Sequence, residues 1–408
     1  MAKRILIFSL AYYPKHIGGA EVAIKEITNR INTEDIQFDM ACLRFDSSLP
    51  KTEKIGNVTI HRIGFSKNNP TMADLKKSSL NLNKFLFQFL AAWEACKLHK
   101  KNNYDAVWAM MAHSSGVPAV IFKIFYPKMP YLLTLQEGDP VNYIKRKMLP
   151  LYPLWKRAFT KANFIQTISN YLAGFARDMG YKGPLEVVPN GVNIRHFSRE
   201  FSLAELNEVK NKIGKKDGDV FIITTSRLVY KNGIGDVIDG IRLLPDNVKF
   251  LILGTGPLEN ELKLQVTNHN LNNRVIFEGQ INHEELPKYL KACDIFIRPS
   301  LSEGMGNSFI EAMAAGIPVI ATQEGGIADF LFDPDRNLDK EPTGLAVNPR
   351  DPEGIAKAVR RYIDDSVLKA RIVENGKKLV FLKYDWDIIA RDMKEKVFDK
   401  ALGDKKSN

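Results

Sequence analysis

Residues 303–311 combine two carboxylates with a glycine-rich stretch that leads into a predicted helix: Glu-Gly-Met-Gly-Asn-Ser-Phe-Ile-Glu. Gly304 and Gly306 allow the backbone to approach a ligand closely, and the amides of a helix N-terminus favour a phosphate. Glu303 and Glu311 can accept hydrogen bonds from hydroxyl groups on either side of that phosphate. The segment therefore suits a ligand such as a nucleoside-diphosphate sugar. Taken alone, either glutamate could instead be an acidic residue that complements the helix dipole.

Two cationic side chains follow the strand expected at residues 221–225. Arg227 and Lys231 are four residues apart, so both can reach a diphosphate at the carboxyl end of that strand. Two cations there would neutralise the charge that develops on a departing phosphate. Arginine and lysine side chains at strand ends often contact nothing but solvent. A role in binding a diphosphate is nevertheless favoured for this pair, because the glutamate segment lies in the same half of the chain.

Glycines follow two other expected strands. Gly18 and Gly19 open a helix after the first strand, where their amides can face a phosphate or an acceptor, although a glycine pair alone is a weak signal. Gly254 and Gly256 form a tight turn that lacks the third glycine and the downstream acidic residue of a dinucleotide fingerprint. We therefore expect no nicotinamide cofactor.

Short β-rich runs alternate with helical patterns along the chain, which predicts an α/β fold with parallel sheets. A polar, irregular stretch at residues 195–218 separates two such series, and we divide the chain into domains 1–200 and 201–383. Two doubly wound domains would face each other across a cleft at the carboxyl ends of their strands, where ligands bind. The expected strands are residues 4–9, 38–43, 58–63, 106–110, 131–135, 164–167 and 185–188, then 221–225, 249–253, 275–278, 295–298 and 319–321.

One apolar stripe has clear helical spacing and is expected to pack against a sheet rather than to enter a membrane. It consists of Leu82, Phe85, Leu86, Phe89, Leu90 and Trp93. No run reaches the roughly 18 apolar residues of a membrane span, and the apolar run at residues 5–11 is interpreted as a buried strand, not a signal peptide.

Composition limits the remaining function classes. The three cysteines are far apart and lack metal-ligand spacing, so no structural metal is expected and a reducing, cytoplasmic compartment fits. Positive charge is concentrated in the first half: residues 1–195 hold 27 Lys and Arg against 14 Asp and Glu, a balance of +13, while the rest has 31 against 33, or −2. An anionic partner of the first half is one interpretation, and a solvated surface is the other.

Taken together, these motifs resemble glycosyltransferase family 4, whose members have the GT-B fold of two Rossmann-like domains. The resemblance covers most of the chain. It rests on Ser-Arg-Leu-Val-Tyr-Lys-Asn-Gly at 226–233, Gly-Thr-Gly-Pro at 254–257, the two glutamates at 303 and 311, Ile-Pro-Val-Ile-Ala at 317–321 with Gly325-Gly326, Pro-Asn-Gly-Val-Asn at 189–193, and Gly18-Gly19.

The resemblance implies a role for each motif. Arg227 and Lys231 would hold the donor diphosphate, Glu303 the transferred sugar, and Glu311 the ribose. The first domain would bind the acceptor, the second the donor, and a terminal helix at 384–408 around Trp386 would pack back on the first. The reaction would retain anomeric configuration by a front-face mechanism. It would need no metal or other cofactor, because Arg227 and Lys231 would take the place of a metal cation. Further donor contacts are expected from Gly18, Gly19, Gly304, Met305, Gly306, Asn307 and Ser308.

One departure from the family lies in the first domain. Where the family usually has a His two residues beyond a Thr, Thr134 is followed by Gln136. His113, which also follows a strand, could compensate or could be structural. Glu137 and Asp139 could contact an acceptor, so the weakest acceptor-side assignments are His113, Gln136, Glu137 and Asp139.

The segment 140–177 contains no acidic residue. Basic residues alternate there with aromatic ones, which suits an anionic bilayer or an acidic glycan as well as a solvated helix face. The residues are Lys145, Arg146, Lys147, Lys156, Arg157, Lys161 and Arg177, with Tyr143, Tyr152, Trp155 and Phe159. We expect peripheral attachment to the inner face of a membrane, and a sugar or lipid-linked acceptor.

Other functions are compatible with parts of this pattern. A sugar-nucleotide epimerase or a glycogen-synthase-like enzyme could use the same fold. A nucleic-acid-binding protein could use the basic first half, but no nucleic-acid motif is present. A carbohydrate-binding protein without activity is disfavoured because the expected catalytic residues are all present.

Overall fold

The computed structural model describes residues 2–15, 17–70 and 78–403. The chain forms two compact units: residues 1–190 with 386–408, and residues 191–385. The change of unit therefore comes ten residues before the boundary that the sequence suggested at 200. Val192 N–H donates to the Tyr384 carbonyl over 2.7 Å, so the two segments at which the chain changes unit pair with each other.

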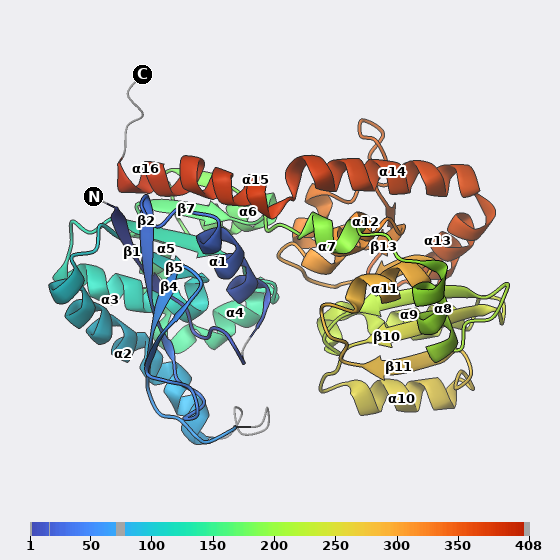
Figure 1. The fold of residues 1–408 in the computed structure, drawn as a ribbon, viewed down its shortest axis with the longest axis horizontal. Coiled ribbons are helices and arrows are strands. Elements are labelled where there is room, and N and C mark those ends of the chain that lie inside the picture. Colours follow the sequence, from blue (N-terminus) through green and yellow to red (C-terminus); the bar gives the residue numbers. More distant parts are fainter. Residues whose placement is uncertain (1, 16, 71–77, 404–408) are drawn as a thin grey trace. The chain divides into compact units, whose positions relative to one another are not determined.

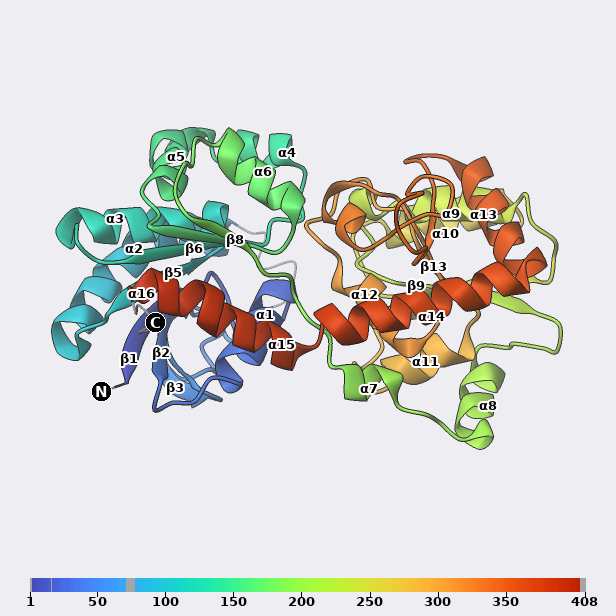
Figure 2. The ribbon, with the colours of Figure 1, turned by 90° about the horizontal axis from the view of Figure 1, so that it is seen from above.

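Unit 1 is built on a sheet with the strand order β3-β4-β2-β1-β5-β6-β7-β8, parallel except for the β3–β4 pair. Helices α1 and α15 lie on one face of this sheet and α3 and α5 on the other (Figures 1 and 2). The strands are β1 (Lys3–Phe8), β2 (Ile36–Leu43), β3 (Thr52–Ile55), β4 (Val58–Ile63), β5 (Ala106–Met110), β6 (Tyr131–Leu135), β7 (Phe164–Thr167) and β8 (Leu185–Val187). The helices are α1 (Gly19–Asn29), α2 (Ser78–Asn102), η2 (Ala112–Gly116), α3 (Val117–Phe125), α4 (Val141–Lys147), η3 (Leu149–Leu151), α5 (Tyr152–Thr160) and α6 (Asn170–Asp178).

The C-terminal helical segment belongs to the core of unit 1. It consists of α15 (Trp386–Asp392), η6 (Met393–Phe398) and α16 (Asp399–Leu402). Trp386 is buried, and the Phe398 ring lies 5.0 Å from that of Trp108 in β5 and 5.8 Å from that of Phe38 in β2. The predicted terminal helix thus packs on unit 1 up to Leu402, and residues 404–408 lie outside the described part of the chain.

Unit 2 contains a fully parallel sheet with the order β11-β10-β9-β12-β13-β14. Helices α9, α10 and α13 bury their apolar residues on one face of it. The strands are β9 (Val220–Thr225), β10 (Val248–Leu253), β11 (Val275–Gly279), β12 (Ile295–Arg298), β13 (Val319–Ala321) and β14 (Leu345–Ala346). The helices are α7 (Ile194–Ser198), α8 (Leu203–Lys212), η4 (Tyr230–Asn232), α9 (Ile234–Ile241), α10 (Glu259–Asn268), α11 (Leu286–Ala292), α12 (Asn307–Ala315), η5 (Gly325–Asp329), α13 (Pro352–Asp364) and α14 (Ser366–Lys383).

The apolar stripe on α2 is largely exposed, whereas the sequence predicted that it packs against the sheet. Leu82, Phe85, Phe89 and Trp93 are 53%, 45%, 41% and 60% exposed. The helix instead buries a second face composed largely of small and amide-bearing side chains: Leu80, Asn83, Phe87, Gln88, Ala91, Ala92, Ala95 and Leu98. The expectation that the stripe packs against the sheet was therefore wrong.

Candidate active site

In unit 2, the glutamate segment connects the end of β12 to the start of α12. Gly306 caps α12 with φ 90°, a left-handed conformation that favours glycine. A Cβ at this position would lie 2.6 Å from the Phe309 ring and 2.9 Å from Arg298 Nη2. The glycine is therefore required both by the backbone angle and by the close packing of the segment. Gly304 and Met305 are buried beside it.

Arg298 holds the Glu303 carboxylate. Its Nη2 donates to Glu303 Oε2 over 3.2 Å, and its Nε donates to Ser300 Oγ over 3.1 Å. The guanidinium carbon also lies 4.3 Å from the centre of the Phe309 ring. Burial lowers the pKa of Arg298, and the charges of Glu303 and Glu311 act in the opposite direction. A buried cation thus stands beside both glutamates that the sequence singled out.

The backbone of Glu303 is held by two glycines of η5. Gly326 N–H donates to the Glu303 carbonyl over 3.0 Å. Gly325 has φ 64°, and a Cβ there would collide with the same carbonyl. The two glycines of η5 therefore position Glu303 through its main chain, which gives a physical reason for the Gly-Gly pair after β13.

The first turns of α12 carry Asn307, Ser308 and Glu311. The Ser308 hydroxyl is buried and has no hydrogen-bond partner among the residues that the structure describes. Glu311 is partly buried, and its Oε1 lies 3.9 Å from Nε2 of His283. The His283 ring stacks on that of His196, with centroids 5.1 Å apart and an angle of 8° between the planes. An unsatisfied hydroxyl at a helix N-terminus is a polar group that a bound phosphate or sugar can satisfy.

The loop that carries Arg227 and Lys231 is tied to the glutamate segment. It follows β9, which is the neighbour of β12 in the sheet. Leu301 N–H donates to the Lys231 carbonyl over 2.7 Å, and Asn232 Nδ2 donates to the Arg227 carbonyl over 2.6 Å. The Arg227 side chain is exposed. The backbone bond between Leu301 and Lys231 thus brings the cationic loop and residues 299–303 to one edge of the unit 2 sheet.

Two glycines of the turn after β10 make room for that loop. A Cβ at Gly254, where φ is 133°, would collide with the Ser226 carbonyl. A Cβ at Gly256 would collide with the Leu228 carbonyl. The turn therefore supports the Arg227 loop by close packing.

In unit 1, Gly18 and Gly19 form the start of α1. The Gly18 N–H donates to Glu21 Oε2 over 2.8 Å, in a capping arrangement. Burial raises the pKa of Glu21, against the lowering effect of its backbone hydrogen bonds. The Gly18 amide is thus used within α1, and a Cβ at Gly19 would meet nothing within 4 Å.

His113 is held by Glu137 in a strained turn after β5. Met111 has φ 68°, and η2 begins directly after it. Glu137 is 3% exposed and accepts from the Ala112 N–H over 2.6 Å and from the Gln136 N–H over 3.0 Å. Its Oε1 also lies 3.4 Å from Nδ1 of His113. Glu137 is therefore a buried orienting group, and His113 is the side chain that it orients.

Gln136 is paired with Asn190. Gln136 Nε2 donates to Asn190 Oδ1 over 3.0 Å, and Asn190 Nδ2 donates to Gln136 Oε1 over 3.3 Å. The residue that replaces the expected His thus forms a reciprocal amide pair. Asp139 is partly buried nearby in sequence.

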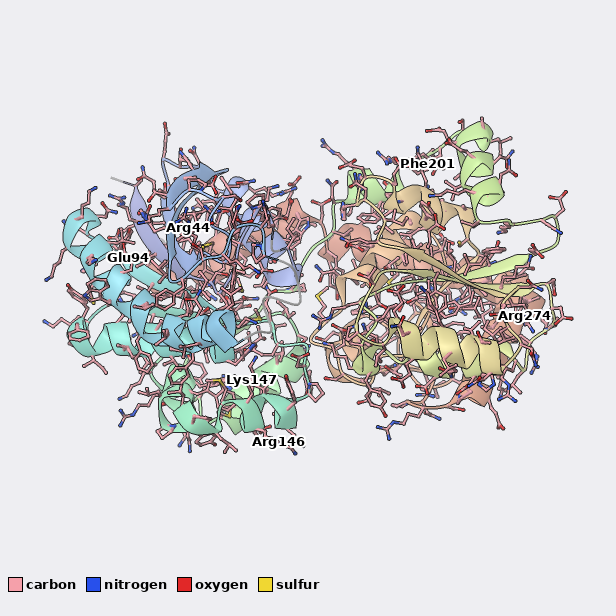
Figure 3. The ribbon with its side chains drawn as sticks, turned by 90° about the horizontal axis from the view of Figure 1, so that it is seen from below. Arg44, Glu94, Arg146, Lys147, Phe201 and Arg274 are labelled. Atoms are coloured by element: carbon pink, nitrogen blue, oxygen red, sulfur yellow. The ribbon has the colours of Figure 1, made fainter. Side chains whose placement is uncertain are left out.

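Only some of the aromatic residues expected at a membrane surface are exposed. Trp155 and Phe159 are fully buried, and their rings lie 5.6 Å apart in the core, so their assignment as surface anchors was wrong. Tyr143 is exposed, and α4 carries Arg146 and Lys147 at the surface of the unit (Figure 3). Among the described residues, no helix has both the length and the apolar character that a membrane crossing requires.

Comparisons with known proteins identify the family to which the chain belongs. A model described as "Glycosyltransferase Family 4" matches residues 17–196, and one described as "Glycosyl transferases group 1" matches residues 206–379. An uncharacterized glycosyltransferase of Methanocaldococcus jannaschii is 32% identical over 51% of this chain and 52% of its own length. The alpha-monoglucosyldiacylglycerol synthase of Streptococcus pneumoniae is 33% identical over 58% of this chain and 55% of its own. The chain thus spans about half the length of these relatives.

A third relative aligns over most of its length. The 2-deoxystreptamine N-acetyl-D-glucosaminyltransferase of Niallia circulans is 26% identical over 87% of this chain and 91% of its own.

Solved structures have the same fold. Sucrose-phosphate synthase of Thermosynechococcus elongatus superposes with a TM-score of 0.80 at 20% identity, over 99% of this chain and 100% of that one. Anabaena HepE in complex with UDP and glucose gives 0.73 at 20% identity, over 97% and 99%. The predicted GT-B fold of two Rossmann-like units is confirmed. The two family models match segments in both units, and the chain belongs to glycosyltransferase family 4.

Proposed function

We propose that the protein transfers a sugar from a nucleoside-diphosphate sugar to a hydroxyl group of an acceptor. The observation that carries the proposal is in unit 2: Arg298 holds Glu303 at 3.2 Å beside the N-terminus of α12, and the Arg227–Lys231 loop is bonded to the same segment. This edge offers cations, helix amides and carboxylates together, which is the set that a diphosphate between two hydroxyl-rich groups requires.

Each donor residue has a role in this proposal. Arg227 and Lys231 bind the diphosphate, and the amides of Gly306, Asn307 and Ser308 supply further donors. Glu303 accepts hydrogen bonds from hydroxyls of the transferred sugar, and Glu311 accepts from the ribose. Because Arg298 forms one bond to Glu303 Oε2, the remaining lone pairs of that carboxylate are available to hydroxyls of the sugar.

The proposed chemistry is front-face substitution with retention. The bond between the anomeric carbon and the leaving phosphate oxygen breaks, and the bond to the acceptor oxygen forms on the same face of the sugar. The acceptor proton passes to an oxygen of the leaving diphosphate. Arg227 and Lys231 stabilise the charge on that diphosphate, so that no metal is required. Full activity in excess EDTA and a product of unchanged anomeric configuration by NMR support this chemistry, whereas loss of activity in EDTA or an inverted product contradicts it.

On the acceptor side, we propose that Glu137 orients His113 toward the acceptor hydroxyl and that Gln136 has a positioning role through Asn190. The acceptor is a glycolipid, a lipid-linked sugar or a polysaccharide precursor. A relative named alpha-monoglucosyldiacylglycerol synthase supports a lipid-linked acceptor.

A lipid-linked acceptor implies a membrane surface, and we propose that unit 1 docks on an anionic bilayer, at its cytoplasmic face. The exposed stripe on α2 supplies the apolar side chains, and Lys145 and Arg146 on α4 supply positive charge. In addition, Lys97 Nζ lies 3.4 Å from the centre of the exposed Trp93 ring, an arrangement that suits the interface between headgroups and acyl chains.

Flotation with liposomes tests the docking proposal. Phe89→Ser/Trp93→Ser and Lys145→Gln/Arg146→Gln should each reduce binding to anionic vesicles. Leu203→Ser/Leu264→Ser is the matched control, because it removes two apolar side chains from unit 2 that are at least as exposed as Phe89 and Trp93. Equal binding of all four proteins, or equal binding to neutral and anionic vesicles, contradicts the proposal.

A thermal-shift screen with nucleoside diphosphates and their sugars tests the proposed function itself. A ligand at a concentration of 100 times its Kd stabilises the folded state by about 2.7 kcal/mol, which raises the Tm measurably. We expect one base to be selected, and Arg227→Gln/Lys231→Gln to abolish the shift. A shift that is unchanged in this variant, or no shift with any nucleotide, contradicts the assignment of unit 2 as the donor site.

A further inference from the structure

Two stacked histidines lie beside Glu311 in unit 2. His283 belongs to the segment between β11 and α11, and His196 belongs to α7. Their rings are nearly parallel, with centroids 5.1 Å apart and an angle of 8° between the planes. The Phe197 ring meets that of His283 edge-on, with centroids 5.4 Å apart. Aromatic contacts from α7 therefore set the orientation of the His283 ring.

Polar contacts fasten the same segment to α7 and to Arg199. His196 Nε2 lies 3.0 Å from the His283 carbonyl, which can only accept, so this nitrogen carries a proton. His196 Nδ1 lies 3.7 Å from Glu284 Oε2, and Arg199 Nη2 donates to the Glu284 carbonyl. His283 is thus held both through its ring and through its main chain.

His283 faces a carboxylate on α12. Its Nε2 lies 3.9 Å from Glu311 Oε1, and the two side chains are 61% and 19% exposed. This distance is too long for a hydrogen bond but short enough for attraction between opposite charges. His283 can therefore restrain one oxygen of Glu311 without using the lone pairs that a hydroxyl group needs.

The charge beside Glu311 changes with pH. Histidine is the side chain that ordinarily gains or loses its charge between about pH 5 and 8. Carboxylates around His283 favour a charge on its ring, whereas the nearby cations and a second proton on the stacked ring oppose it. These groups are Glu311 of α12, Glu284, Arg298 of β12, Arg199, and His196 of α7. Protonation of His283 places a cation directly beside Glu311.

We propose that His283 is a positioning residue for the contact between Glu311 and the ribose of the donor, and that its imidazolium form strengthens this contact. A cation near Oε1 restrains the Glu311 side chain, so less rotamer freedom is lost when the ribose hydroxyls bind. As the pH rises and His283 loses its charge, the affinity that the ribose contributes should fall. This role rests on the proposed function, since the ribose contact of Glu311 is part of it.

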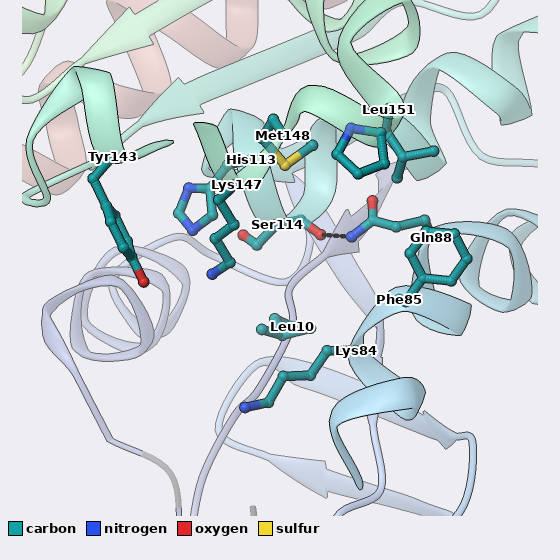
Figure 4. A pocket seen from close by; sticks show the side chains of 11 residues that line it. Leu10, Lys84, Phe85, Gln88, His113, Ser114, Tyr143, Lys147, Met148 and Leu151 are labelled. Carbon is teal, nitrogen blue, oxygen red and sulfur yellow. Dashed lines mark hydrogen bonds between the residues drawn. The ribbon is translucent and has the colours of Figure 1, made fainter. Parts of the chain in front are cut away.

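Binding is a more specific readout than transfer, because transfer would also respond to a second histidine. His113 is assigned to the acceptor side, and Figure 4 shows it among the residues that line a pocket of about 530 Å³ in unit 1. The contribution of the ribose is the ratio of two dissociation constants, that of a 2′,3′-dideoxynucleoside diphosphate divided by that of the parent nucleoside diphosphate. Because both nucleotides carry the same diphosphate, titration of the phosphate cancels in this ratio.

Calorimetry of the full-length chain with UDP, GDP, ADP and their 2′,3′-dideoxy forms tests the proposal. For each base that the protein binds, the wild-type ratio should be about two- to fivefold larger at about pH 5.5 than at about pH 8. His283→Gln should remove this dependence on pH. His283→Arg should keep the ratio high at both values, because an arginine stays charged. His269→Gln is the control, since it removes a histidine that faces a different carboxylate of unit 2, Asp239, over 2.9 Å.

The outcomes separate the role of His283 from the proposed function. A wild-type ratio that is the same at both pH values overturns the proposal, as does a dependence on pH that persists in His283→Gln. Loss of the dependence in His269→Gln, or a low ratio in His283→Arg, overturns it as well. If none of the nucleotides binds, the donor site itself is wrong, whereas bound nucleotides with a ratio that His283 does not affect refute only the role of this residue.

Discussion

Arg298 Nη2 lies 3.2 Å from Glu303 Oε2, and both side chains are largely buried. The arginine ends β12, and the glutamate stands in the loop that leads to α12. A strand end and a helix start are thus joined by an ion pair at the position where we place the donor sugar.

Removal of Arg298 should destabilise the protein. In Arg298→Met the Glu303 carboxylate keeps its position but loses its buried partner, and breaking a buried pair in this way costs about 3–5 kcal/mol. Chemical denaturation of Arg298→Met, Glu303→Gln and the double variant measures the coupling between the two residues. If the stability losses of the two single variants add up to the loss in the double variant, the contact between Arg298 and Glu303 does not contribute to stability.

Gly306→Ala should damage the site more than the fold. The strained φ of 90° costs about 1–3 kcal/mol, and the new Cβ would press on Phe309 and Arg298. Gly218→Ala is the control, because Gly218 has φ 82° and open space around its Cβ. Both variants should lose stability by denaturation, and only Gly306→Ala should lose affinity for the nucleotide donor in calorimetry. Equal donor affinities of the two variants would contradict this account of Gly306.

Glu21 should make the stability of unit 1 depend on pH. Burial raises its pKa in the folded state, so the folded protein binds this proton more tightly than the unfolded chain does. The Glu21 carboxyl therefore does not change the free energy of unfolding below its unfolded pKa of 4.5. It destabilises the folded protein as the pH rises from there through the folded pKa. The free energy of unfolding of Glu21→Gln minus that of wild type should therefore increase with pH above 4.5. A difference that stays constant or falls over this window contradicts the prediction.

The sequence predicted the parallel strands well because they are continuous apolar runs bounded by polar turns. The strands at residues 58–63, 106–110, 131–135, 164–167, 295–298 and 319–321 have the predicted bounds. β3 was missed since it is a short edge strand with the partly exposed sequence Thr-Glu-Lys-Ile, and β14 contains only two residues. Burial of a whole strand leaves a strong compositional signal, whereas an edge strand leaves little.

The orientation of α2 could not be read from its large apolar residues. The helix has two faces with helical spacing, and the buried one contains Asn83, Gln88 and three alanines. Asn83 Nδ2 donates to the Phe65 carbonyl over 2.7 Å, and Gln88 donates to Ser114, so these amides are buried by specific partners that are far away in sequence. A hydrophobic pattern weighs side chains by size and polarity and does not register such partners.

Arg298 was overlooked for a related reason. It stands at the end of the apolar run Ile-Phe-Ile-Arg, where an arginine is usually solvated. The signal that could have identified it is its position five residues before Glu303, on the strand that leads into the glutamate loop. The Gln136–Asn190 pair likewise joins residues 54 positions apart, and no local pattern predicts it.

Calorimetric comparison of Glu303→Gln with wild type tests the central claim most directly, using a nucleoside diphosphate and the corresponding nucleoside-diphosphate sugar. If Glu303 binds the sugar, the variant should retain affinity for the nucleoside diphosphate within about twofold and lose the additional affinity for the sugar nucleotide together with transfer activity. Equal loss of both affinities, or unchanged transfer, would show that Glu303 does not contact the transferred sugar.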